Sequence, residues 1–267
     1  MKSRKNRPIG VFDSGVGGLT VVKSIRRLLP REDIIYFGDT ARVPYGNKSR
    51  STIMRFAREI MAFMMAKRVK MVVVACNTAS SFSLPRLSKD YPVPVMGVIT
   101  AGVKEAVRIS KSGKVGVIGT RSTVSSGSYE KELARIDKTC RVYSKDCPLF
   151  VPLVENSFFS DPITYEVARK YLGGLKKKRI DTLILGCTHY PLVKNVVKDI
   201  MGDVRLVDSS IAVARDVKEA LIKEGLQTGS RKKKGRTRYY VSDDPESFSK
   251  IGSIFLKEKI NAKKVSI

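Results

Sequence analysis

The chain has 267 residues, of which 51 are Lys or Arg and 25 are Asp or Glu, so its formal net charge is +26. With 42% hydrophobic residues and four cysteines, this composition excludes a disordered chain, a collagen-like chain and a disulfide-rich secreted miniprotein. The length allows one large hydrophobic core or two small ones.

Short apolar runs predict strands along the whole chain, and helical patterns alternate with them. In chain order the expected strands are Ile9–Phe12, Ile34–Phe37, Met71–Ala75, Val93–Val98, Val115–Ile118, Thr182–Leu185, Arg205–Val207 and Arg238–Val241. The clearest helix has its apolar side chains on one face, at Ile53, Phe56, Ala57, Ile60, Met61 and Met64. Asp208–Ser210 is the expected N-cap of a later helix that Gly225 ends. This alternation predicts an α/β fold with mainly parallel sheets and helices on both faces.

The sequence also repeats itself loosely. Ile9–Ser14 resembles Val115–Thr120, and Val73–Thr78 resembles Ile184–His189, in the same order and at similar spacing. We interpret this as a duplication that produces two pseudo-symmetric, doubly wound lobes. The expected first lobe comprises residues 1–99 and 211–267, and the second comprises residues 100–210. Ligands of such sheets bind beyond the carboxyl ends of the strands, so we expect the active site in the cleft between the lobes.

The excess of positive charge is dense in four segments: residues 1–7, 176–179, 231–236 and the C-terminal region. No zinc-finger spacing occurs, and no basic segment leads into heptads. We interpret the charge as a solvated basic surface, whose contact with nucleic acid is at most non-specific.

No membrane-spanning or targeting segment is predicted. The most apolar stretch, Met61–Ala75, is interrupted by Lys67, Arg68 and Lys70, whereas a span needs ~20 nearly uncharged residues. The basic N-terminus leads into the strand-like Ile9–Phe12 rather than into the apolar core of a signal peptide. We therefore expect a cytoplasmic protein whose cysteines stay reduced.

Cys76 and Cys187 are the candidate reactive groups, because each follows an apolar strand and precedes small polar residues that open a helix. The N-terminus of a helix is expected to lower the pKa of a thiol and favour the thiolate. His189, the only histidine, lies two residues after Cys187, where it can tune a thiol or bind a carboxylate. Cys140 and Cys147 lack such a setting and are expected to be structural.

Asp13 and Glu155 are the candidate carboxylates. Asp13 precedes the glycine-rich segment Gly15–Gly18, which lets the backbone approach a bound group closely. The order of these residues matches neither a dinucleotide fingerprint nor a Walker A loop. Glu155 follows a short apolar run and, judged alone, is a solvated side chain. Cys76, Cys187 and His189 lack zinc-ligand spacing, so no metal is expected.

Several segments together resemble the glutamate racemases of the aspartate/glutamate racemase family: Gly10–Leu19, Tyr36–Thr40 with Val43–Gly46, Ala75–Ser80 and Leu185–Leu192. The resemblance implies an enzyme of bacterial cell-wall synthesis that interconverts L- and D-glutamate without a cofactor, supplying D-glutamate for peptidoglycan. The expected partners are the small-molecule substrate and a second copy of the chain in a homodimer.

The resemblance also implies roles for individual residues. Cys76 would take the Cα proton from D-glutamate with the help of Asp13, and Cys187 would take it from L-glutamate with the help of Glu155 and His189. The implied substrate contacts are Asp13, Ser14, Pro44, Tyr45, Gly46, Cys76, Asn77, Thr78, Thr120, Cys187, Thr188 and His189. Asn156 and Ser157 depart from the acidic or glycine residues that the family has after the glutamate.

This mechanism agrees with the reading of the residues themselves. Inverting a stereocentre by proton transfer needs a base on one face and an acid on the other, and two similar lobes supply one thiol each. Backbone N–H groups around Ser14, Thr78 and Thr188 would neutralise the two carboxylates of glutamate in a water-poor cleft. The alternatives are a racemase of aspartate or hydantoins, a thiol hydrolase with Cys187 as nucleophile and His189 as base, and a nucleic-acid-binding protein.

Overall fold

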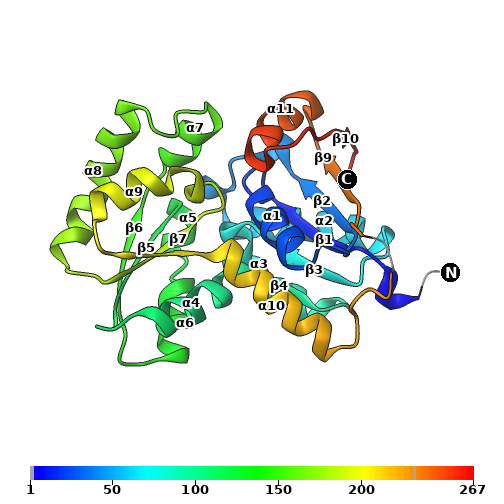
Figure 1. The fold of residues 1–267 in the computed structure, drawn as a ribbon, viewed down its shortest axis with the longest axis horizontal. Helices are drawn as coiled ribbons and strands as arrows, with labels where there is room; N and C mark the ends of the chain where they lie inside the picture. The colour runs from blue at the N-terminus through cyan, green and yellow to red at the C-terminus, as the bar shows by residue number, and fades with distance from the viewer. Residues whose placement is uncertain (1–2, 231–232) are drawn as a thin grey trace.

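The computed structural model describes residues 3–230 and 233–267; Met1, Lys2, Arg231 and Lys232 of the basic segments lie outside this description. Within these ranges the chain forms two parallel sheets, which lie side by side and are covered by helices (Figure 1). Blue, cyan and orange-red segments, from the two ends of the chain, build the half around the first sheet. Green and yellow segments build the half around the second sheet. The expected α/β class with two doubly wound sheets is confirmed.

The first sheet has six strands in the order β10-β9-β2-β1-β3-β4. Its strands are β1 (Ile9–Asp13), β2 (Ile34–Gly38), β3 (Met71–Val74), β4 (Val95–Gly97), β9 (Thr237–Val241) and β10 (Ala262–Lys264). The helices of this half are η1 (Arg4–Asn6), α1 (Leu19–Leu28), η2 (Thr40–Arg42), η3 (Tyr45–Asn47), α2 (Arg50–Ala66), α3 (Asn77–Asp90) and α11 (Pro245–Leu256). The central strand β1 is buried along its whole length, as expected for a parallel sheet covered on both faces.

The second sheet has four strands in the order β6-β5-β7-β8. Its strands are β5 (Lys114–Gly119), β6 (Arg141–Asp146), β7 (Thr182–Gly186) and β8 (Arg205–Asp208). The helices of this half are α4 (Val98–Ile109), α5 (Arg121–Ser125), α6 (Ser128–Ile136), α7 (Phe150–Glu155), α8 (Pro162–Lys177), η4 (Tyr190–Val193) and α9 (Lys194–Met201). Helix α10 (Ser209–Lys223) packs against both α1 and α4 and so joins the two halves.

The internal repeat of the sequence is visible in the strand order. The cysteine that follows β3 lies beside β1, and the cysteine that follows β7 lies beside β5, because β1 pairs with β3 and β5 pairs with β7 in parallel. Each half therefore presents one cysteine just past the end of an inner strand, at the carboxyl edge where ligands of parallel sheets bind.

The two strands that the sequence did not predict, β6 and β10, are both edge strands. Their residues are only partly buried, and one of them has only three residues. Edge strands carry polar and charged side chains and so lack the apolar run that identifies an inner strand.

The expected helices are present. The apolar face that runs from Ile53 to Met64 is buried in α2. The Asp208 side chain accepts a hydrogen bond from the backbone N–H of Ser210 at 2.9 Å, and Gly225 follows the end of α10 with a φ of 62°. No helix among residues 3–230 and 233–267 is long and apolar enough to cross a membrane.

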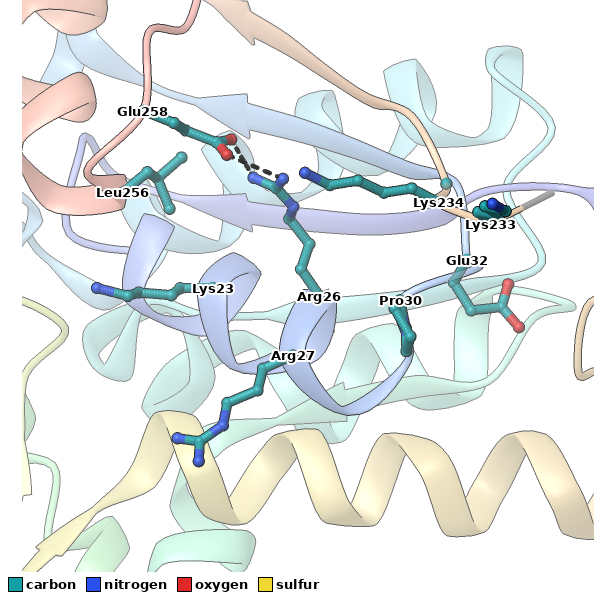
Figure 2. A pocket seen from close by; sticks show the side chains of 10 residues that line it. Lys23, Arg26, Arg27, Pro30, Glu32, Lys233, Lys234, Leu256 and Glu258 are labelled. Atoms are coloured by element: carbon teal, nitrogen blue, oxygen red, sulfur yellow. Dashed lines mark hydrogen bonds and ion pairs between the residues drawn. The ribbon is translucent and has the colours of Figure 1, made fainter.

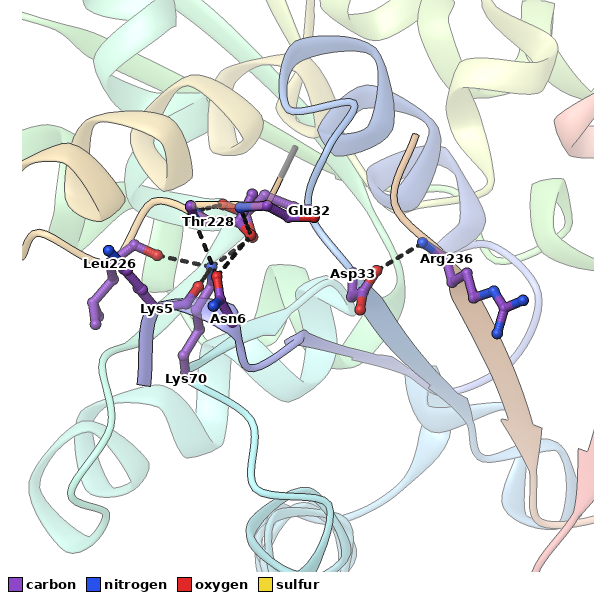
Figure 3. Close-up of polar contacts among 10 residues, drawn as sticks. Lys5, Asn6, Glu32, Asp33, Lys70, Leu226, Thr228 and Arg236 are labelled. Atoms are coloured by element: carbon purple, nitrogen blue, oxygen red, sulfur yellow. Dashed lines mark hydrogen bonds and ion pairs between the residues drawn. The ribbon is translucent and has the colours of Figure 1, made fainter. Parts of the chain in front are cut away.

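A buried ion pair ties four distant segments together near the amino ends of β2 and β3 (Figure 3). The Lys70 ammonium lies 2.5 Å from the Glu32 carboxylate and donates to the backbone carbonyls of Lys5 and Leu226, each at 2.8 Å. Glu32 also accepts from the backbone N–H of Thr228 at 2.8 Å. Both charges are thus hydrogen-bonded, which a buried ion pair requires. Lys70, which interrupts the most apolar stretch of the sequence, is a core residue.

Candidate active site

A cavity of about 590 Å³ opens where the carboxyl ends of β1 and β3 face those of β5 and β7. Every substrate contact implied by the family resemblance lines this cavity except Asp13, which is buried. Cys76 and Cys187 therefore share one cavity. Glu155, from α7, belongs to the same wall.

Cys76 connects β3 to α3 and caps the helix. Its Sγ atom accepts a hydrogen bond from the backbone N–H of Ala79 at 3.5 Å, and the side chain is only 6% exposed. Burial and the negative charge of Asp13 raise the pKa of this thiol to about 12, although the Ala79 N–H and the Ser14 hydroxyl act in the opposite direction. The expectation of a lowered pKa at Cys76 is thus wrong, because desolvation outweighs the hydrogen bond from the helix N-terminus.

Cys187 follows β7 and has a cationic neighbour instead. Its Sγ atom lies 3.8 Å from His189 Nδ1, and His189 Nε2 lies 3.1 Å from a carboxylate oxygen of Glu155. Burial lowers the pKa of His189, but its hydrogen bonds to Cys187 and Glu155 raise it more, to about 10. The imidazole is therefore charged at neutral pH and lies between the sulfur and the carboxylate.

Asp13 connects the loop after β1 to the second sheet. Its carboxylate accepts from the backbone N–H of Gly15 at 3.1 Å and from the Thr188 hydroxyl at 3.3 Å. Burial raises the pKa of Asp13, and the charge of His189 opposes that rise. A Cβ atom on Gly17 would lie 2.4 Å from the Thr188 hydroxyl and 2.6 Å from His189 Nδ1. Glycine is required there because the loop passes so close to the other half.

The loop around Tyr45 closes another side of the cavity. The Tyr45 hydroxyl donates to the buried carboxylate of Asp39, and the carbonyl of Gly46 accepts from the Ser122 hydroxyl of α5 at 2.8 Å. A Cβ atom on Gly46 would come within 2.7 Å of Thr120. Asp39 was not predicted as a site residue, although it belongs to Tyr36–Thr40, one of the segments that carry the family resemblance.

A cluster of three hydroxyl groups crosses from one half of the protein to the other. Thr78 Oγ1 lies 3.0 Å from Thr120 Oγ1 and 3.1 Å from Thr123 Oγ1. Thr123 was not identified from the sequence, nor was Arg121, a cationic residue of the cavity wall in addition to His189. The signal for Thr123 was its place three residues after Thr120, whose hydroxyl caps α5 by accepting from the Thr123 N–H at 3.3 Å.

The other two cysteines lie outside this cavity. Cys147 is buried and its thiol contacts the carbonyl of Lys145 at 3.7 Å, while the Cys140 thiol donates to Asp137 at 3.4 Å. All four cysteines are free thiols. Within the part of the chain that the structure describes, no group of three or more His, Cys, Asp or Glu side chains is placed to hold a metal ion.

A model of the family described as Asp/Glu/Hydantoin racemase matches residues 9–217. The chain is 47% identical over 255 residues to a glutamate racemase of Geobacter metallireducens, with 95% of this chain and 94% of the relative covered. It is 49% identical over 257 residues to a glutamate racemase of Thermoanaerobacter pseudethanolicus, with 96% and 95% covered.

Solved structures give the same result. Glutamate racemase isoform RacE1 from Bacillus anthracis superposes with a TM-score of 0.96 at 38% identity, and 98% of both chains is covered. Glutamate racemase from Francisella tularensis, crystallised in complex with D-glutamate, superposes with a TM-score of 0.92 at 41% identity, again with 98% of both chains covered. An aspartate racemase from Picrophilus torridus has a TM-score of 0.57 at 18% identity, covers 80% of this chain and 94% of its own, and shares the fold alone.

Proposed function

The chain belongs to the Asp/Glu/hydantoin racemase family and is an isomerase that interconverts L- and D-glutamate, and we propose that Cys76 and Cys187 carry out this reaction as a pair of opposed proton-transfer groups. The observation that supports the proposal most directly is that both thiols line one cavity between the two sheets. Inversion at Cα needs a base and an acid on opposite faces of the substrate, and one group from each half meets that requirement.

The neighbouring charges suggest which sulfur acts as base first. The Cys187 sulfur lies 3.8 Å from the charged imidazole of His189, whereas burial and the negative charge of Asp13 raise the pKa of the Cys76 thiol, so we assign Cys187 as the first base and Cys76 as the first acid. In the direction from L to D, the Cys187 thiolate takes the proton from Cα. The electron pair of the broken C–H bond then takes a proton from the Cys76 thiol on the opposite face. Cys187 ends as a thiol and Cys76 as a thiolate, and the reverse reaction restores the starting state.

The intermediate carbanion needs electrostatic support, which the strand ends are placed to give. We propose that N–H groups at Ser14, Thr78 and Thr188 bind the carboxylates of glutamate and that Asp13 faces its ammonium group. Donors that are fixed before the reaction and shielded from water stabilise developing charge more strongly than solvent does. The remaining implied contacts, Pro44, Tyr45, Gly46, Asn77 and Thr120, form the surrounding wall.

The decisive experiment compares Cys76→Ala, Cys187→Ala and the control Cys140→Ala, a free cysteine outside the cavity. Circular dichroism with each glutamate enantiomer in D₂O should show no racemisation in the first two variants and wild-type racemisation in the control. In the wild type, L-glutamate should gain deuterium at Cα as it becomes D-glutamate. Activity retained by Cys76→Ala would contradict the two-base mechanism and favour a hydrolase-like role for Cys187.

We further propose that the product is D-glutamate for peptidoglycan synthesis, made in the cytoplasm without a cofactor. The four free cysteines support a reducing compartment. Expression of the chain should restore growth of a bacterium that requires added D-glutamate, and the Cys187→Ala variant should not.

We also propose that residues 1–99 with 211–267 and residues 100–210 are two lobes that close on the substrate. The contacts between their cavity walls are short polar contacts, such as Thr78 with Thr120 and Asp13 with Thr188. Small hydroxyl contacts of this kind can exchange their partners for substrate oxygens, while the apolar core that spans both halves stays closed. Small-angle scattering should give a smaller radius of gyration with D-glutamate than without it; equal values would contradict closure.

A homodimer is proposed on a separate observation. Phe158, in the loop before α8, and Ile163, in the first turn of α8, leave large apolar side chains about half exposed (46% and 52%). Apolar surface of this kind marks a contact site when it is continuous. Light scattering should give twice the chain mass, and Phe158→Ser should shift the equilibrium toward the monomer.

The basic surface is proposed to bind polyanions weakly and without sequence preference. Lys23, Arg26, Arg27, Lys233 and Lys234 surround a separate cavity of about 340 Å³ (Figure 2). Only Arg26 among them has a carboxylate partner at contact distance in the described ranges, Glu258. Affinity for a duplex oligonucleotide should fall steeply as salt is raised and should not depend on sequence.

A further inference from the structure

Tyr129 contacts the neighbours of both proposed bases. It lies in the first turn of α6, and its hydroxyl donates to Asn77 Oδ1 at 2.7 Å. A Cβ atom on Gly186 would lie 3.1 Å from Cε2 of the Tyr129 ring, so the ring packs directly on that glycine. Asn77 follows Cys76, and Gly186 precedes Cys187. One buried side chain therefore connects the two strand ends that carry the thiols.

The hydrogen bond fixes the orientation of the Asn77 amide. An asparagine amide has one oxygen acceptor and one nitrogen with two N–H donors, on opposite sides of a planar group. Because Oδ1 is held by Tyr129, the nitrogen is the group left for the cavity that Asn77 lines. Burial raises the pKa of the Tyr129 hydroxyl, so it keeps its proton and remains a donor. A carboxylate, which only accepts hydrogen bonds, is matched by an amide held this way.

We propose that Tyr129 is a positioning residue for the racemisation: it directs the N–H donors of Asn77 at a substrate carboxylate and, through its contact with Gly186, holds the two cysteine-bearing strand ends at their working separation. This inference rests on the proposed two-base function and extends it to a residue that touches no substrate. Tyr129 is buried and is not part of the cavity wall, so its effect passes through Asn77 and Gly186.

The other polar contacts between the halves differ from this one. Thr78, Thr120 and Thr123 meet through small hydroxyl groups, and two of the three line the cavity. Such a group can exchange its partner for a substrate oxygen when the ligand enters. The Tyr129 hydroxyl cannot change its partner in this way, because the ring is enclosed in the core between α4, α6 and the second sheet. It is therefore the rigid member of the contact between the halves.

The test is Tyr129→Phe, which keeps the ring on Gly186 and removes only the hydroxyl. The Asn77 amide then loses its donor and is free to turn its oxygen toward the substrate. We expect KM for both enantiomers to rise about tenfold, the usual effect of leaving one buried acceptor unpaired, with a smaller change in kcat. Tyr190→Phe is the matched control, because it removes a buried hydroxyl that donates to the Cys147 carbonyl at 2.8 Å within one half. It should lower the melting temperature and leave KM unchanged.

A double-mutant cycle separates positioning from general support of the fold. In an Asn77→Ala background, Tyr129→Phe should leave KM unchanged, because the group it positions is gone. A full additional rise in KM in that background, or an unchanged KM in Tyr129→Phe alone, would overturn the inference. The two-base function is judged separately by Cys76→Ala and Cys187→Ala. If those variants are inactive while Tyr129→Phe behaves as the wild type, only the role of Tyr129 is lost.

Discussion

The ends of β3 and β7 occupy equivalent places in two similar sheets, yet they have opposite electrostatic surroundings. Beside Cys76 lies the anion of Asp13, and burial together with that charge raises the pKa of the thiol to about 12. Beside Cys187 lies the imidazolium of His189, held by Glu155. The two halves thus share a backbone arrangement around the cysteines, while the neighbouring side chains place a carboxylate beside one sulfur and a charged imidazole beside the other. A two-base mechanism needs one acid and one base, and in the mechanism proposed here this difference in surroundings sets which sulfur takes which role first.

The largest effect should come from His189→Asn, which removes the cation on the Cys187 side. We expect kcat/KM to fall about 10³-fold, within the usual range for loss of an acid–base partner. The two enantiomers have equal free energy in water, so kcat/KM must fall equally in both directions. The proton transfer that is slowed is identified instead by the primary deuterium isotope effect on kcat/KM. Relative to the wild type, this effect should be larger with Cα-deuterated L-glutamate and smaller with Cα-deuterated D-glutamate. Equal changes for both would contradict the pairing of His189 with Cys187.

The mirror-image experiment is Asp13→Asn, on the Cys76 side. Removing the negative charge lowers the pKa of the Cys76 thiol and makes its thiolate a weaker base toward D-glutamate. We expect a fall of about 10²-fold in kcat/KM. The isotope effect should now grow with deuterated D-glutamate and shrink with the L form. If Asp13→Asn gave the same isotope effects as His189→Asn, the pairing of Asp13 with Cys76 would be wrong.

The difference in electrostatic surroundings between Cys76 and Cys187 was the feature that could be predicted least from the sequence. Inner strands such as β1 and β7, and the buried face of α2, follow from local runs and periods of apolar residues, which a sequence shows directly. The cysteines were found because each comes after such a strand. The direction of the pKa shift of Cys76 was predicted wrongly, because it depends on burial and on Asp13, which lies 63 positions away in the sequence. The residues next to Cys76 predicted a helix N-terminus, which lowers the pKa of a thiol. They did not predict the burial, which raises that pKa more.

The contacts that join the two halves were unpredictable for the same reason. The partners of Thr123 and Tyr129, Thr78 and Asn77, are about 50 residues away in the sequence. Lys70 interrupts the most apolar stretch of the sequence, and in the structure its charge is buried against Glu32. A sequence shows that a charge is present; the fold decides whether it has a partner.

The smallest expected effect, Glu155→Gln, tests how the Cys187 side is maintained. Glu155 is partly exposed (side chain 32%) and contacts the imidazole rather than the sulfur, so we expect only about a tenfold loss in kcat/KM at pH 7. The pH profile is more sensitive. The pKa of His189 is raised to about 10, so the positive charge beside Cys187 is present at neutral pH and is lost as the pH rises through that value. The glutamine variant lacks one of the two partners that raise this pKa, so its activity should begin to fall at a lower pH. An alkaline limb at the wild-type position would mean that Cys187 alone holds the imidazole in its charged form, and that Glu155 serves only to orient the ring.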